Sequence, residues 1–164
     1  MNVRANVELP MPFADEAREA MVAFWWTSTL LKKVSRRFFR QRGSSEAQFN
    51  LLMALKYVHG PDSQADGPLT QNELSRRLLV DKSNVTGLID RLEALGLIRR
   101  NQVANDRRSY HISLTDAGRE MIDTLEVPYR DVIARVMSPF TPAEQRELIR
   151  LTRKLRVALA DGGL

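Results

Sequence analysis

Residues 69–115 hold two short helix patterns and two strand patterns in an order that few folds share. Thr70 and Glu73 stand three apart before an apolar-periodic run, so they form a capping box that predicts a helix starting at about residue 71. "LVDKS" interrupts this run, and a second helix pattern covers residues 83–96, ending at Gly96. The apolar positions of the second helix share one face: Val85, Leu88, Ile89, Leu92 and Leu95.

Two strands are predicted directly after the second helix, over residues 97–102 and 107–114. In the later strand Tyr110, Ile112 and Leu114 alternate with polar residues, which is the two-residue period of a half-buried strand. Asn105-Asp106 between the strands is turn chemistry, so the pair forms a hairpin. Two neighbouring helices joined by a four-residue turn and followed at once by a hairpin predict a winged helix-turn-helix.

The flanking segments read as helices. The first spans residues 13–41, and its apolar residues recur at three- and four-residue spacing: Ala17, Met21, Phe24, Leu31, Val34 and Phe38. A capping box at Ser45 and Gln48 starts the next helix, and Thr115-Asp116 opens another. Pro128 and Pro139 punctuate the remainder before a last helix with a leucine stripe: Leu148, Leu151, Leu155 and Leu159.

We therefore expect a mainly α protein with a small β-hairpin (α+β). Its expected parts are an N-terminal helix in residues 1–43, the winged lobe in 44–115 and C-terminal helices in 116–164. Phe24, Trp25 and Trp26 widen the apolar surface of the first helix beyond what one neighbouring helix would cover.

Positive charge gathers in two places. The formal net charge is +5, and residues 69–115 hold eight basic and five acidic residues, so more than half of the excess lies in the winged segment. A basic surface there fits a polyanion partner. Residues 20–45 hold six basic residues and no acid. This second cluster is either a solvent-facing helix surface, a set of peripheral phosphate contacts, or a partner for acids of another subunit.

Several other classes of protein find no support in the sequence. There is no cysteine, which removes disulfides and thiolate metal sites and is compatible with a cytoplasmic location. No apolar run is long enough to span a bilayer, and no secretory signal is evident. His59 and His111 belong to no spaced set that would bind zinc, and no phosphate loop or nucleophile elbow occurs. We expect no enzyme, no metal and no cofactor.

The outward face of the helix at residues 83–96 carries small hydrogen-bonding side chains in its first turn: Ser83, Asn84, Thr86 and Gly87, then Asp90 and Arg91. A helix whose N-terminus enters the major groove of DNA needs small side chains there, because bulk would hold the backbone away from the base edges. Asn84 suits an adenine edge, and Thr86 a thymine methyl or a phosphate. The alternative is that Ser83 and Asn84 only cap the helix.

The whole segment "LTQNELSRRLLVDKSNVTGLIDRLEALGLIRRNQVANDRRSYHISLTDAGREM" resembles the DNA-binding core of MarR-type transcriptional regulators. The features in register are "VTGLIDRLEALGLIRR", the Asp-x-Arg of "NDRRS" and "LTDAGRE". The resemblance implies a homodimer in which the first helix and the last two helices of each chain intertwine. It also implies a palindromic double-stranded operator and no membrane partner.

Carried over by position, the resemblance implies a DNA-binding set: Lys82, Ser83, Asn84, Thr86, Gly87, Arg91, Asp106, Arg107 and Arg108. Arg108 matches the wing arginine that enters the minor groove, and Asp106 matches the acid that orients the wing. Arg107 points the other way and meets a phosphate or solvent. Gly87 departs from the family pattern, which often has an arginine there.

Family members are commonly repressors released by small phenolic or anionic ligands, so a small-molecule effector is expected. Trp25, Trp26 and Phe49 are candidates for its pocket from aromatic placement alone. A second reading is a winged-helix protein-interaction module that has lost DNA binding, with Gly87 as its only support.

Overall fold

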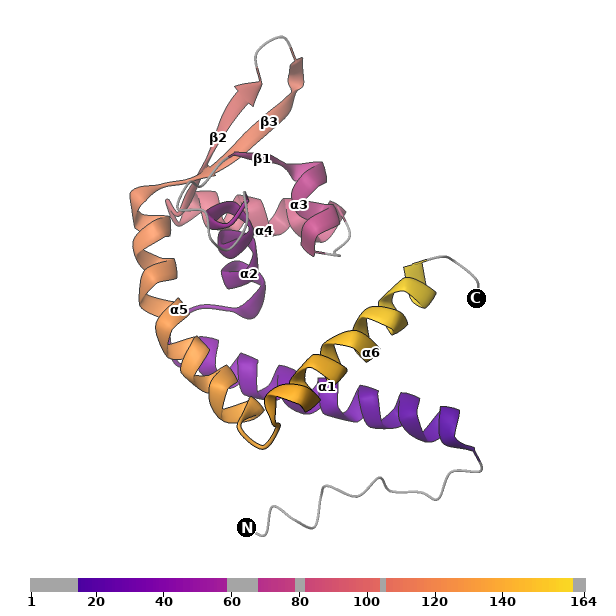
Figure 1. The fold of residues 1–164 in the computed structure, drawn as a ribbon. Helices are drawn as coiled ribbons and strands as arrows, with labels where there is room; N and C mark the ends of the chain where they lie inside the picture. The colour runs from indigo at the N-terminus through magenta and orange to yellow at the C-terminus, as the bar shows by residue number, and fades with distance from the viewer. Residues whose placement is uncertain (1–14, 59–67, 79–81, 104–105, 161–164) are drawn as a thin grey trace. The chain divides into compact units, whose positions relative to one another are not determined.

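The computed structural model describes residues 15–58, 68–78, 82–103 and 106–160; within these ranges the side chains of Lys82, Val103 and residues 106–109 are not described. The chain forms two compact units, residues 1–119 and 120–164. Helices dominate, with a small antiparallel sheet in the first unit (Figure 1). This confirms the expected mainly α fold with a hairpin. None of the helices in the described ranges has the length and hydrophobicity that crossing a membrane requires.

The first two helices begin where the sequence supplies caps. α1 (Glu16–Arg40) starts after Asp15, whose carboxylate accepts a hydrogen bond from the backbone N–H of Arg18 at 2.8 Å. α2 (Glu46–Lys56) starts at the predicted capping box of Ser45 and Gln48. Between the two helices Gly43 has a φ of 68°, a left-handed conformation that favours glycine at a helix end.

The next two helices form the predicted helix-turn-helix. α3 (Gln71–Leu78) begins at the capping box, with the carboxylate of Glu73 accepting hydrogen bonds from the N–H and hydroxyl of Thr70. α4 (Lys82–Ala94) buries Val85, Leu88, Ile89 and Leu92, as expected. Leu95 was expected on the same face but is 61% exposed, because α4 ends at Ala94 and Gly96, at a φ of 69°, turns the chain.

Three strands form one sheet in the order β1-β3-β2. β2 (Ile98–Val103) and β3 (Asp106–Leu114) are the predicted hairpin, which extends away from α2, α3 and α4 (Figure 1). β1 (Leu69–Thr70) is a third strand that the sequence did not predict, and it pairs with β3 through Leu69 and Ile112. The sheet thereby fixes the start of α3 to the base of the wing.

The turn from β3 into the next helix is closely packed. α5 (Asp116–Met137) is capped by Thr115, whose hydroxyl accepts from the N–H of Gly118 at 3.1 Å and donates to the carbonyl of Gly96 at 2.6 Å. A Cβ added to Gly118 would stand 2.1 Å from the carbonyl oxygen of Leu97, so only glycine fits there. This explains the glycine of "LTDAGRE".

The second unit contains most of α5 and all of α6 (Pro142–Ala160). α5 runs through Pro128, although a proline lacks the N–H that an interior helix position donates. α6 begins at the predicted capping box of Thr141 and Glu144, with Pro142 at the first helical position. Large apolar side chains of α6 are exposed in the single chain: Leu148, Ile149, Leu151, Val157 and Leu159.

Candidate DNA-binding surface

The outward face of α4 is open to solvent. Ser83, Asn84, Thr86, Asp90 and Arg91 are all exposed. Gly87 is half-buried, and a Cβ built there would meet no atom within 4 Å, so the position has room for a larger side chain. The buried face of α4 holds it on the lobe, leaving this row of small polar groups facing outward as predicted.

A residue outside the predicted set holds one of these side chains. The Nε2 of Gln71, the first residue of α3, donates a hydrogen bond to the hydroxyl of Thr86 at 2.6 Å. The two residues are fifteen apart in the sequence. The capping box had placed Gln71 at the start of α3, but no local pattern indicated which residue of α4 would lie opposite it.

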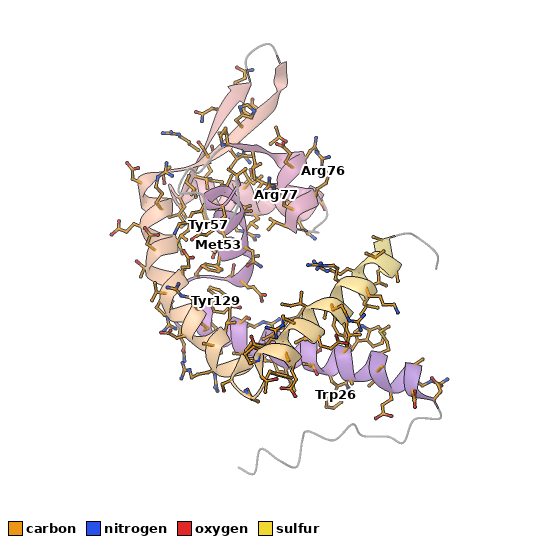
Figure 2. All side chains as sticks on the ribbon, in the orientation of Figure 1. Trp26, Met53, Tyr57, Arg76, Arg77 and Tyr129 are labelled. Carbon is orange, nitrogen blue, oxygen red and sulfur yellow. The ribbon has the colours of Figure 1, made fainter. Side chains whose placement is uncertain are left out.

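α3 is anchored at its start and basic near its end. Its start depends on Glu73, and the hydrogen bonds from Thr70, together with the charges of Arg76 and Arg77, hold the pKa of Glu73 below its ordinary value. The Arg76 and Arg77 side chains lie on α3 in Figure 2. The guanidinium of Arg77 also donates to the carbonyl of Val58 at 3.3 Å, which ties α3 to the chain just after α2.

An ion-pair network joins α4 to the wing. The guanidinium of Arg100 on β2 contacts the carboxylates of Asp90 and Glu93 on α4, and its backbone N–H donates to Glu93 at 3.2 Å. Burial alone would lower the pKa of Arg100, but the hydrogen bond from Asp90 and the charges of both acids raise it above its ordinary value. The wing and α4 are therefore linked at the base of the hairpin.

The wing itself carries three of the predicted residues. The backbone of Asp106, Arg107 and Arg108 lies in β3, starting opposite Val103 of β2. A shift in register between Gln102 and Val103 interrupts the pairing just before this point. The side chains of these three residues fall outside the described part of the structure, as does that of Lys82, whose backbone begins α4.

Comparison with known proteins places this geometry in a family. A sequence model of the MarR family matches residues 43–109. An uncharacterised HTH-type transcriptional regulator of Bacillus subtilis, YkoM, is 33% identical over 143 residues, which cover 85% of this chain and 88% of that protein. The chain belongs to the MarR family. It is thus a DNA-binding transcriptional regulator and not an enzyme.

Two further matches extend this MarR-family assignment. The transcriptional repressor MprA of Escherichia coli is 30% identical over 119 residues, which cover 73% of this chain and 64% of the repressor. The MarR-family regulator Sco3205 of Streptomyces coelicolor, solved in complex with DNA, superposes with a TM-score of 0.77 at 25% identity, covering 92% of this chain and 93% of that one. The winged helix-turn-helix predicted from residues 69–115 is confirmed.

The three aromatic effector candidates of this MarR-family chain do not meet in one place. Trp25 and Trp26, 62% and 44% exposed, line a hollow of about 480 Å³ along α1, with Trp26 visible on that helix in Figure 2. Phe49 is only 4% exposed, and its ring packs 4.9 Å from that of Phe39 in the core. The pocket of all three residues stays a prediction.

A larger groove of about 830 Å³ lies between α1, the start of α2 and α4. It contains two members of the predicted DNA-binding set, Asn84 and Arg91, together with basic residues of α1. No group of three or more metal-binding side chains occurs within the described ranges. The groove joins the second basic cluster of the sequence to the recognition helix, which sequence spacing could not indicate.

Proposed function

We propose that this protein is a homodimeric repressor that binds a pseudo-palindromic operator, with α4 in the major groove and the β2–β3 hairpin in the minor groove, acting in the cytoplasm. The observation that carries the proposal is the exposed face of α4. It presents Ser83, Asn84 and Thr86 in the first turns, where short polar side chains let a helix N-terminus approach base edges closely.

Each part of the DNA-binding set takes a role under this proposal. Asn84 addresses an adenine edge, and Thr86 a thymine methyl or a phosphate. Arg108 reads the minor groove while Asp106 orients the wing. Arg107 and Lys82 meet phosphates, so each releases counterions on binding and makes affinity fall with salt.

Dimerisation is supported by apolar surface that a monomer would leave in water. On α1 the exposed large side chains are Met21, Phe24, Trp25, Trp26, Leu30, Leu31 and Val34. α6 carries a second exposed apolar set. Contiguous patches of this kind mark interaction surfaces, and a two-fold dimer would bury the same patch on both chains. Two lobes then read half-sites about one helical turn, roughly 10 bp, apart.

Release by a small aromatic or anionic ligand completes the proposal. It is supported by the resemblance to MarR-type regulators and by the hollow beside Trp25 and Trp26 on α1. Phe49 could join such a site only if the core around Phe39 opened, because its ring is buried there.

The wing provides the sharpest test. Operators would first be selected from random duplexes with the wild-type protein, and binding would then be compared for Arg108→Ala and Arg107→Ala. Loss of Arg108 is expected to cost about 1–3 kcal/mol and to relax base preference at the wing position. Loss of Arg107, the matched neighbour, is expected to weaken all duplexes equally and to reduce the salt dependence.

The rival function is a winged-helix protein-interaction module. Gly87 favours it, because α4 lacks a basic side chain in its middle where the family often has one. Failure of the wild-type protein to select any duplex would support this module and refute the repressor. Equal effects of the two wing substitutions would refute the assignment of Arg108 to the minor groove.

A further inference from the structure

The groove between α1, α2 and α4 gathers positive charge from distant parts of the chain. Lys32, Arg36 and Arg40 come from α1 at spacings of four residues, which place them on one face, and Arg91 comes from α4. Glu46 is the only carboxylate among the residues that line it. The lining therefore holds four cations against one anion.

These cations have no charge partner in the described part of the chain. None of Lys32, Arg36, Arg40 and Arg91 makes an ion pair with a described carboxylate, whereas Arg100 nearby engages two. Like charges that share one concave site repel one another, and a cleft lined by one sign of charge concentrates counter-ions of the other sign. An anion in the groove would relieve that repulsion.

The rest of the lining indicates the size and body of the anion. The volume of about 830 Å³ lies within the range of small-molecule sites. Leu78, Val85 and Leu88 supply apolar surface. The hydroxyl of Ser44, which also lines the groove, is buried with no hydrogen-bond partner among the described residues. A buried polar group without a partner is costly, so a nearby acceptor would be favourable.

We propose that this groove binds a small molecule with an apolar body and at least two negative charges, and that its occupancy and operator binding exclude each other. The exclusion follows from Asn84 and Arg91, which line the groove and also lie on the exposed face of α4. A ligand that draws these two side chains toward α1 removes them from DNA. This inference rests on the proposed operator binding by α4.

Phthalate, a dianion with an aromatic body, is the probe, and dimethyl phthalate is its neutral control at matched ionic strength. The variant Arg36→Gln/Arg40→Gln changes the groove wall on α1, which is outside the DNA-binding set. Arg37→Gln is the matched control, because Arg37 is exposed on the same helix and does not line the groove. Operator binding without probe is measured first, so that failure of the proposed function is seen separately from failure of the groove.

Calorimetry should show phthalate, but not its diester, binding to the wild type and to Arg37→Gln. For both proteins the apparent operator Kd should rise without a plateau, by about 11-fold at about ten times the probe's own dissociation constant. The double variant should bind operator normally and lose this response.

Three results would overturn the inference. Wild-type protein that binds operator but not phthalate has no such anion site. Inhibition that levels off would show probe and DNA bound together. A double variant that loses operator affinity and salt dependence without probe would mean that the groove holds DNA phosphate instead.

Discussion

Gly87 stands in the interior of α4, with open space where a side chain would begin. Glycine in a helix interior costs about 0.8–1.0 kcal/mol relative to alanine, because it loses more backbone freedom on folding. A Cβ at this position meets no atom within 4 Å, so Gly87→Ala adds neither a clash nor appreciable burial. We therefore expect Gly87→Ala to stabilise the protein by about 1 kcal/mol.

Urea unfolding at fixed protomer concentration measures this gain, because a dimer's apparent stability depends on concentration. The alanine variant also serves as the control for Gly87→Arg. Relative to alanine, the arginine should raise operator affinity and steepen the slope of log K against log salt by about 0.9, the effect of one added phosphate contact. Operator affinity of Gly87→Ala itself should match the wild type.

Two results would refute this reasoning. A destabilised Gly87→Ala would mean that the position is packed against something, so the face of α4 is not open. An arginine that binds operator no better than alanine would mean that this face does not approach DNA.

Three further predictions concern the supports of α4 and α3. Arg100→Met should lower stability to urea by about 1 kcal/mol, since it removes partly exposed ion pairs between β2 and α4; an unchanged midpoint would argue against that link. Gln71→Ala should cost about 1 kcal/mol in operator binding and loosen selectivity at the base that Thr86 faces, measured with base-substituted duplexes; an unchanged base preference would remove Gln71 from that role. Because the pKa of Glu73 is lowered by its bonds from Thr70, its stabilisation is present above the ordinary value of 4.5 and lost as pH falls through the lower, folded-state value. Acid titration of unfolding should therefore show a smaller loss in this range for Glu73→Gln, and identical curves would contradict the assignment.

The elements that could be predicted were those with local signals. The capping boxes at Ser45, Thr70 and Thr141 each start a helix at the expected residue, because a cap and its partner lie only three residues apart. The glycine ends at Gly43 and Gly96 are local for the same reason, since both have positive φ. Periodicity likewise gave the buried face of α4 and the paired strands.

What the sequence missed depends on contacts between distant residues. β1 has two residues and no pattern of its own, and it exists because Leu69 pairs with Ile112 of β3. Gln71 meets Thr86, and Arg100 meets α4, across turns whose geometry a single sequence does not determine. The groove of α1, α2 and α4 requires three helices to be placed before its charge can be recognised.

Operator binding as a function of salt tests the central claim most directly. The duplex would be the region upstream of the protein's own gene, compared with a scrambled duplex of equal length. We predict specific binding to that region, with log K falling linearly and steeply as log salt rises, because basic side chains of α4 and the wing displace counterions from phosphates. Undetectable binding, or binding that does not change with salt, would contradict the assignment of α4 and the wing to DNA.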